Sequence, residues 1–125
     1  MILGVGIDIV SVKRIKNSIE RYGERFIRRV FTKKEQEYCS GKAYPFDSYA
    51  GRFAVKEAAF KALGRGWYDC GGFTSVEVTT DKNGLPQPVF HGKAREFAIS
   101  IHVKKIFVSI THDANVSVAV VILEG

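Results

Sequence analysis

The most constraining feature of the chain is an alanine-rich stretch at residues 48–64, SYAGRFAVKEAAFKALG. Alanine has the highest intrinsic helix propensity, so this composition favours a single helix. Asp47 or Ser48 can cap its N-terminus, and Gly64 with Gly66 forms a natural stop. The stretch therefore predicts one long helix that begins near residue 48 and ends at residue 63.

Strands and further helices are predicted on both sides of this stretch. Alternating or β-branched residues indicate strands, apolar residues three and four positions apart indicate helices, and Asn83-Gly84 is a strong turn signal. Strands are predicted at 1–10, 73–80, 106–112 and 115–123. A helix is predicted at 12–26, capped by Ser11 and bent or broken at Gly23, and another at 91–101. Thr32 and Glu35 have the spacing of a capping box and predict a short helix between them and the loop at 40–47. Because the last two strands pair as an antiparallel hairpin, we predict an α+β fold.

Length and composition place the chain among small globular domains. It has 125 residues, of which 46% are hydrophobic and 26% charged, so residues 1–125 are expected to form one domain. No apolar run is long enough to span a bilayer, and no basic segment precedes the apolar opening, which argues against a secretory signal. Cys39 and Cys70 have no CxxC spacing, so we expect free thiols and a cytoplasmic protein.

Positive charge is concentrated in residues 13–34. That segment contains nine basic and two acidic residues, a net charge of +7, whereas the whole chain carries +6. Such a patch implies a polyanionic partner, which can be a nucleic acid, a membrane surface or an acidic protein. Charge alone does not choose among these three.

Asp8 breaks the local pattern because it stands inside an apolar strand, where an unpaired carboxylate is costly to bury. It must be paired, exposed at an edge or bound to a cation. Glu57 and Lys61 share one helix face with the small residues Ala50 and Ala54, which leave room for a close approach. The simpler interpretation is a solvated surface ion pair.

His112 ends a predicted strand, where a histidine is more often structural than functional. His91 and His102 have no partner pattern, and no CxxC or HExxH motif occurs, so a zinc site is not expected. Two carboxylates without Cys or His ligands suit a hard cation such as Mg²⁺. P-loop and dinucleotide-binding fingerprints are also absent, and neither cysteine has the context of a nucleophile.

Five blocks in fixed order carry a resemblance to a known family. They are GIDIV at 6–10, FTKKE at 31–35, GRFAVKEAAFKALGRG at 51–66, DKNGLP at 81–86 and VSITH at 108–112. Together they resemble the holo-acyl-carrier-protein synthases, the short single-domain class of 4′-phosphopantetheinyl transferases, over nearly the whole chain. The resemblance implies that family's fold, a small antiparallel sheet packed with helices.

The resemblance implies transfer of 4′-phosphopantetheine from coenzyme A to a serine of an apo acyl carrier protein, as in fatty acid biosynthesis. Adenosine 3′,5′-bisphosphate is released. By the same analogy Asp8 and Glu57 hold Mg²⁺, and Lys61 contacts phosphate and steadies the leaving group. These three are the expected catalytic residues, and either Glu57 or a water on the metal takes the serine proton.

Further residues are assigned by the same resemblance. Coenzyme A is expected to contact Arg52, Lys61, Gly64, Asn83, Gly84, Pro86, Ser109, Thr111 and His112. Leu85 departs from the family pattern of a basic or small residue, which removes a phosphate contact there. The acidic carrier protein is expected on the basic stripe, which consists of Arg14, Arg21, Arg25, Arg28 and Arg29.

The family is typically a homotrimer with active sites at the subunit interfaces. Val116, Val118 and Val120 face either a neighbouring subunit or the core. The alternative function, a small basic nucleic-acid-binding domain, uses the same patch but lacks aromatic residues interleaved with the basic ones. It also leaves Asp8 and the Glu57–Lys61 face unexplained. The expected partners are therefore coenzyme A and an acyl carrier protein, with neither a nucleic acid nor a membrane.

Overall fold

The computed structural model describes residues 1–125 and contains two antiparallel sheets and five α-helices. One sheet has three strands in the order β1-β5-β4, and the other pairs β2 with β3. The elements in chain order are β1 (Ile2–Ser11), α1 (Val12–Tyr22), α2 (Glu24–Val30), α3 (Lys33–Ser40), α4 (Pro45–Leu63), a 3-10 turn (Phe73–Ser75), β2 (Val76–Thr80), β3 (Pro86–Phe90), α5 (Gly92–Ser100), β4 (Lys105–Asp113) and β5 (Val116–Glu124). The predicted α+β fold is confirmed.

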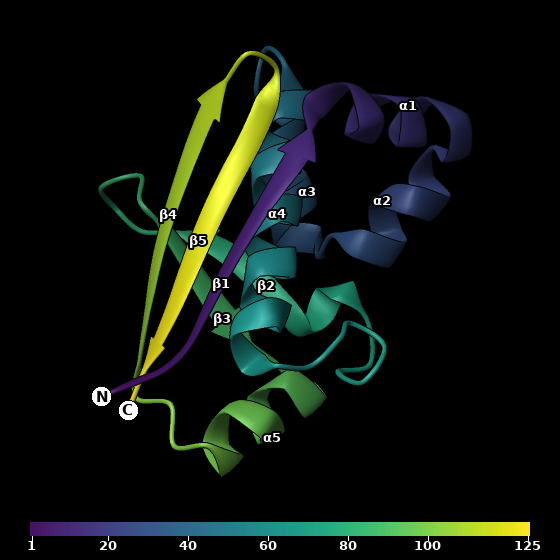
Figure 1. Ribbon diagram of the computed structural model, residues 1–125. Coiled ribbons are helices and arrows are strands. Elements are labelled where there is room, and N and C mark those ends of the chain that lie inside the picture. The colour runs from purple at the N-terminus through teal and green to yellow at the C-terminus, as the bar shows by residue number, and fades with distance from the viewer.

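Helix α4 lies behind the three-stranded sheet, α1 and α2 extend to one side, and α5 lies near the two chain ends (Figure 1). The main contacts of α4 are with β1 and β5. Most of its length is buried, because small and apolar side chains surround it on nearly every side. None of the helices is long and apolar enough to cross a membrane.

The backbone of β1 lies directly on the backbone of α4, and two glycines make this possible. A Cβ atom at Gly6 would lie 1.8 Å from the carbonyl oxygen of Ala58, and one at Gly4 would lie 2.0 Å from that of Ala62. Both distances are far inside van der Waals contact, so no other residue fits without moving the strand. Since strand side chains alternate, Asp8 points to the same side as Gly4 and Gly6, toward α4.

The three-stranded sheet has one buried and one exposed face. On β5, alternate residues beginning with Ser117 are buried beneath α4, whereas those beginning with Val116 are only partly covered. The second set, Val116, Val118 and Val120, therefore lies on the outer face rather than in the core. Ile7 and Ile9 share that face at 60% and 66% exposure. One chain alone leaves this apolar surface uncovered.

A buried ion pair ties α3 to α4. The Lys56 Nζ lies 2.8 Å from the Glu35 Oε1, and both side chains are inaccessible to solvent. The Glu35 carboxylate also accepts hydrogen bonds from the backbone N–H groups of Thr32 and Val78. Lys56 donates to the carbonyl of Phe73 at 3.2 Å. These bonds satisfy both charges and hold β2 and α3 against one side of α4.

Two sequence-based boundaries were wrong. Helix α4 begins at Pro45, so Asp47 lies in its first turn and Tyr44 occupies the cap. Proline fits the first helical position because that N–H needs no helical partner. The strand predicted at 73–80 begins only at Val76, since residues 73–75 form the 3-10 turn.

The local capping signals were confirmed. The Ser11 Oγ accepts a hydrogen bond from the Arg14 N–H at the start of α1, and Thr32 and Glu35 form a capping box. Gly23 separates α1 from α2 with φ 58°, and Gly64 ends α4 in the left-handed region. Short-range hydrogen bonding determines these helix ends, which is why sequence patterns predict them.

We predict that Gly6→Ala lowers the free energy of unfolding by about 3 kcal/mol, because the new Cβ would collide with the α4 backbone. Chemical denaturation measures the change. Gly41→Ala is the matched control, since a Cβ there would meet only ordinary contacts at 3.6 Å, and it should change stability by less than about 0.5 kcal/mol. Equal stabilities for the two variants would contradict the close-approach argument.

Candidate active site

Asp8, Glu57 and Lys61 come together where β1 crosses α4. The Lys61 Nζ lies 3.0 Å from the Asp8 Oδ1 and also donates to the Ile7 carbonyl at 3.0 Å. Glu57 and Lys61 are one helical turn apart, so both reach the strand from the same helix face. The Asp8 side chain is 16% exposed, whereas Lys61 is 54% exposed. The interpretation of Glu57–Lys61 as an isolated surface pair is wrong, because Lys61 pairs with Asp8.

Glu57 makes no hydrogen bond or ion pair, although its side chain is half-buried. Burial raises the pKa of its carboxyl group, the nearby charge of Asp8 raises the pKa further, and Lys61 opposes the shift. Asp8 and Glu57 both line a cleft of about 280 Å³, which also contains side chains of Ser11, Arg14, Ser18, Phe26 and Phe53. Two carboxylates thus face one cleft, where Lys61 pairs with Asp8 and leaves Glu57 without an ion-pair partner.

The donor set of this cleft fits a hard cation. No group of three or more His, Cys, Asp or Glu side chains is arranged to hold a metal ion. The cleft therefore lacks the ligand set of a structural zinc site. Mg²⁺ typically takes one or two protein carboxylates and completes its shell with water and phosphate oxygens. Asp8 and Glu57 match that requirement.

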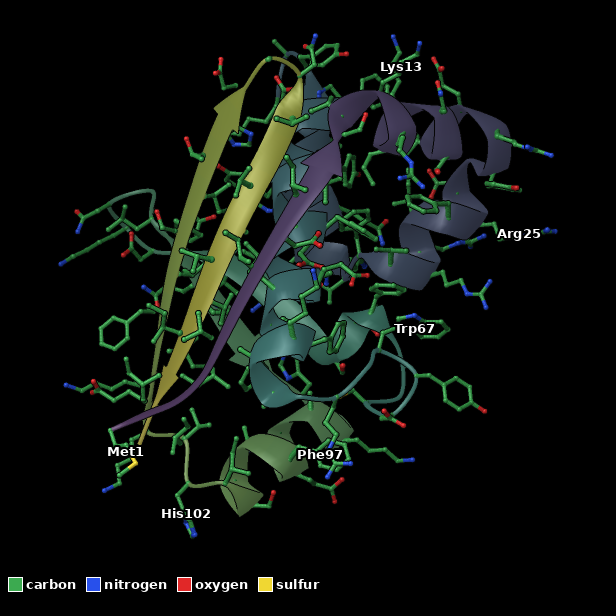
Figure 2. The ribbon with its side chains drawn as sticks, viewed as in Figure 1. Met1, Lys13, Arg25, Trp67, Phe97 and His102 are labelled. Atoms are coloured by element: carbon green, nitrogen blue, oxygen red, sulfur yellow. The ribbon has the colours of Figure 1, made fainter.

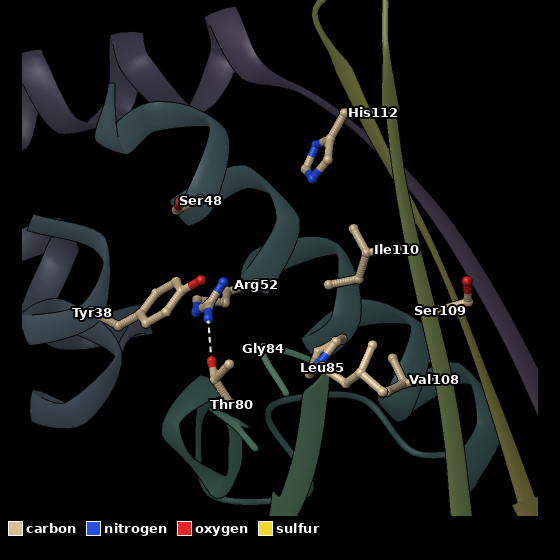
Figure 3. A pocket seen from close by; sticks show the side chains of 11 residues that line it. Tyr38, Ser48, Arg52, Thr80, Gly84, Leu85, Val108, Ser109, Ile110 and His112 are labelled. Atoms are coloured by element: carbon tan, nitrogen blue, oxygen red, sulfur yellow. Dashed lines mark hydrogen bonds between the residues drawn. The ribbon is translucent and has the colours of Figure 1, made fainter. Parts of the chain in front are cut away.

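A second cleft, of about 310 Å³, lies between α4 and β4 and is closed below by the β2–β3 turn (Figure 3). Arg52, Gly84, Pro86, Ser109 and His112 line it, as does Leu85. The other lining residues were not proposed as ligand contacts from the sequence: Tyr38, Ser48, Thr80, Val108 and Ile110. The Arg52 Nη2 donates to the Thr80 Oγ1 at 3.1 Å. This buried guanidinium gives the cleft its positive character.

His112 is held over α4 by contacts on two sides. Its Nδ1 lies 2.7 Å from the Ser117 Oγ of β5, so the Nε2 remains as the nitrogen without a protein partner. The absence of a side chain at Gly51 makes room for the ring, because a Cβ there would lie 3.1 Å from the His112 Cε1. One ring nitrogen of His112 therefore bonds to Ser117, while the other has no protein partner.

The remaining residues predicted to contact coenzyme A do not all lie in the second cleft. Ser109 and Thr111 alternate with Ile110 and His112 along β4, so their side chains lie on the outer face of the sheet. Figure 3 shows the Ser109 side chain on the far side of β4 from Arg52. Gly64, Asn83 and Thr111 do not line the second cleft. Lys61 does not line it either, but contacts Asp8 of the first cleft.

The two clefts lie at opposite edges of the sheet. Asp8 is on β1, whereas His112 is on β4, and the central strand β5 separates them. One chain therefore does not bring Lys61 and Arg52 to the same opening.

The basic stripe is exposed on α1 and α2. Arg14, Arg21, Arg25, Arg28 and Arg29 are all accessible to solvent, and Figure 2 shows Arg25 extending away from the body of the protein. Arg14 also lines the first cleft beside Asp8 and Glu57. The stripe thus begins at the carboxylate cleft and continues outward along two helices.

A family model described as the 4'-phosphopantetheinyl transferase superfamily matches residues 4–121. The chain therefore belongs to the 4'-phosphopantetheinyl transferase superfamily.

The most similar relatives have a more specific name. Holo-[acyl-carrier-protein] synthase of Solibacter usitatus is 46% identical over 125 residues, with both chains covered completely. The enzyme of the same name from Geobacter metallireducens is 44% identical, covering 99% of this chain and 98% of its own.

Solved structures agree with this assignment. Holo-[acyl-carrier-protein] synthase from Neisseria meningitidis superposes with a TM-score of 0.91 at 29% identity, covering all of both chains. The Helicobacter pylori synthase, solved in complex with coenzyme A, gives a TM-score of 0.84 at 31% identity and covers 96% of this chain and 99% of its own. The fold implied by the resemblance is therefore confirmed.

Both cysteines lie outside the two clefts as free, buried thiols. Burial raises the pKa of the Cys39 thiol to about 12. Because the thiolate is the reactive form, we predict that a maleimide reagent labels neither cysteine in the folded protein at mildly alkaline pH. Mass spectrometry before and after addition of denaturant measures the labelling. The variant Ser40→Cys, at an exposed neighbouring position, should react at once, and labelling of Cys39 at the same rate would contradict the prediction.

Proposed function

We propose that this protein transfers 4′-phosphopantetheine from coenzyme A to a serine hydroxyl of an apo acyl carrier protein and releases adenosine 3′,5′-bisphosphate. The observation that carries the proposal is the Asp8–Glu57–Lys61 group in a chain of this family. Its relatives are named holo-[acyl-carrier-protein] synthases, and one was solved with coenzyme A. The acceptor protein is expected to serve fatty acid biosynthesis.

Asp8 and Glu57 would hold Mg²⁺ in the first cleft. When bound, the ion neutralises charge on pyrophosphate oxygens and orients the phosphorus for attack. The fit rests on the two carboxylates that share the cleft and on the absence of a protein partner for Glu57. Lys61, already 3.0 Å from Asp8, adds a positive charge on the open side of the same group.

The transfer forms one phosphorus–oxygen bond and breaks another. The serine oxygen attacks the phosphorus that carries pantetheine, and the bond to the bridging pyrophosphate oxygen breaks. We assign the serine proton to the carboxylate of Glu57, whose two oxygens allow it to serve both as a ligand and as a base. Lys61 stabilises the negative charge that collects on the departing bisphosphate. Both residues project from α4, so their spacing is fixed by a single helical turn.

The second cleft would bind the nucleotide end of coenzyme A. Arg52 supplies charge for a phosphate, His112 offers a free ring nitrogen, and Gly84 and Pro86 shape the wall beneath them. Since the pyrophosphate has to reach Asp8 and Glu57, the phosphate available to Arg52 is the 3′-phosphate on the ribose. Gly64, Asn83, Ser109 and Thr111 stay proposals as further contacts.

We propose a homotrimer in which each active site combines the first cleft of one subunit with the second cleft of its neighbour. Two observations support this arrangement. The clefts lie at opposite edges of one sheet, and the sheet's outer face carries apolar side chains on all three strands, with Ile9 and Phe107 exposed and Val118 partly exposed. Packing that face against another subunit would bury the apolar surface and bring Arg52 toward Lys61 of the neighbour.

The basic stripe would dock the acidic carrier protein. It begins with Arg14 at the mouth of the carboxylate cleft, which is where the acceptor serine has to arrive. Opposite charges on the two surfaces would speed association and fix its orientation. No observation favours the nucleic-acid-binding alternative, and a cytoplasmic location stays a prediction supported by the two free thiols.

The reaction and its metal dependence can be tested together by intact mass spectrometry of an apo acyl carrier protein. We expect a mass gain of one phosphopantetheine after incubation with the protein, coenzyme A and Mg²⁺, and none after addition of a chelator. Asp8→Asn and Glu57→Gln should lower turnover by about 100-fold or more, because each removes one electrostatic group from the reacting centre. Glu37→Gln, at an exposed position on α3, is the control. Near-normal turnover in both cleft variants would exclude the assigned roles.

Subunit complementation tests the interfacial site. Asp8→Asn and Arg52→Met should each be inactive alone, and co-refolding equal amounts should restore activity. A quarter of the sites, on a random assembly, would combine two intact clefts, so we expect about 25% of wild-type activity. Light scattering checks that the mixture is trimeric. No recovery in a confirmed mixed trimer would mean that each site belongs to one subunit.

Carrier docking is tested by Arg25→Glu in a salt series. We expect KM for the carrier protein to rise about tenfold while KM for coenzyme A stays unchanged, because Arg25 is exposed on α2 and does not line the carboxylate cleft. Added salt should raise the same KM in the wild type and less in the variant. Lys82→Glu, on the β2–β3 turn, is a charge-matched control outside the stripe. If neither the substitution nor added salt changed KM for the carrier protein, the basic stripe would not be its docking surface.

A further inference from the structure

Tyr38, on α3, is the one aromatic ring in the second cleft, and two cations lie against it. The Arg52 Cζ is 3.8 Å from the ring centroid and the Lys42 Nζ is 4.4 Å from it. Both distances are well within the range of a cation–π interaction. Two like charges thus contact the same aromatic ring, which offsets part of their mutual repulsion.

Arg52 has more donors than the protein satisfies. The residue is only 7% exposed, its Nη2 donates to Thr80, and its Nε is buried without any acceptor. A buried guanidinium with unused N–H groups is destabilising unless an anion completes it, and a phosphate is the best geometric match.

The phenol of Tyr38 lies close to the positive charges of Arg52 and Lys42. Burial of Tyr38 by itself raises the phenol pKa, but the charges of Arg52 and Lys42 outweigh burial and hold the pKa below its ordinary value. The close-up in Figure 3 shows the ring of Tyr38 beside Arg52, on the side of the cleft opposite His112. The ring therefore forms one wall of the cleft and not only a support beneath it.

We propose that Tyr38 is a positioning residue that holds Arg52 and Lys42 together as one anion site and thereby sets the preference for a ligand with a ribose 3′-phosphate. The inference rests on the proposed function, since it assumes that the nucleotide end of coenzyme A enters this cleft. It adds Tyr38 and Lys42 to the residues that determine specificity. We assign this role to the aromatic ring. The hydroxyl group also hydrogen-bonds to Lys42 and Arg52, and Tyr38→Phe separates the two contributions.

Calorimetric binding of two nucleotides to the full-length protein tests the proposal. Adenosine 3′,5′-bisphosphate and adenosine 5′-monophosphate differ only in the 3′-phosphate. The dissociation constant of the monophosphate divided by that of the bisphosphate therefore measures the preference for that group. We expect Tyr38→Leu to reduce the ratio about tenfold, the scale of a desolvated cation–π contact. Tyr38→Phe keeps the ring and should retain the wild-type ratio. Lys42→Met, at an exposed position, should reduce the ratio about threefold.

Tyr22→Leu is the matched control, because Tyr22 also lies under an arginine, Arg21 at 5.3 Å, but on α1 and away from the cleft. An unchanged ratio in Tyr38→Leu, or an equal loss in Tyr38→Phe, would overturn the proposal. Should Tyr38→Leu fail to fold by circular dichroism, Lys42→Met decides, and an unchanged ratio in that variant overturns it. Absence of phosphopantetheine transfer by the wild type would instead reject the proposed function, which keeps the two failures distinct.

Discussion

The contact between the backbones of β1 and α4 is the constraint on which the rest of the structure depends. Gly4 and Gly6 allow the strand to lie on the carbonyl groups of Ala58 and Ala62. That contact fixes both the distance and the rotation of α4, since a helix that touches a strand so closely cannot turn without a collision. Asp8, two residues beyond Gly6, consequently reaches the helix at the level of Lys61.

The opposite side of α4 is fixed by charge rather than by close backbone contact. Lys56 and Glu35 form a fully buried pair whose other hydrogen bonds go to β2, to the 3-10 turn and to the cap of α3. Removing one partner would leave a buried charge unpaired, a change that typically costs about 3–5 kcal/mol. Two neighbouring residues of α4 thus have different roles: Lys56 holds the helix in place, and Glu57 faces the cleft.

The sequence predicted the parts of the fold that depend on neighbours in the chain. The caps at Ser11 and Thr32, the break at Gly23 and the end of α4 at Gly64 all rest on short-range hydrogen bonding or backbone conformation. Pro45 was missed as a start signal because the loop before α4 contains several turn-forming residues. The strand alternation also left open which face of β5 is buried, since both faces are apolar.

The candidate site was predictable where residue types conflicted with their surroundings. Asp8 in an apolar strand is such a conflict, and its contact with Lys61 resolves it. Tyr38 and Thr80 gave no signal, because an aromatic residue in a short helix and a threonine at a strand end are ordinary. Only the packing of α3 and β2 around α4 brings them to Arg52. Alternation along β4 did contain the information that Ile110 and Val108 share a face with His112.

The pairing of the first strand with the last has a consequence for how the chain is made. Strand β5 lies between β1 and β4, and the two termini are joined by hydrogen bonds of 3.1 and 3.0 Å between Met1 and Gly125. The middle strand of the sheet is therefore the last of its three strands to be synthesised. Until β5 leaves the ribosome, β1 and the apolar side of α4 lack that partner strand and stay exposed. Assembly of the sheet consequently waits for β5, Val116–Glu124.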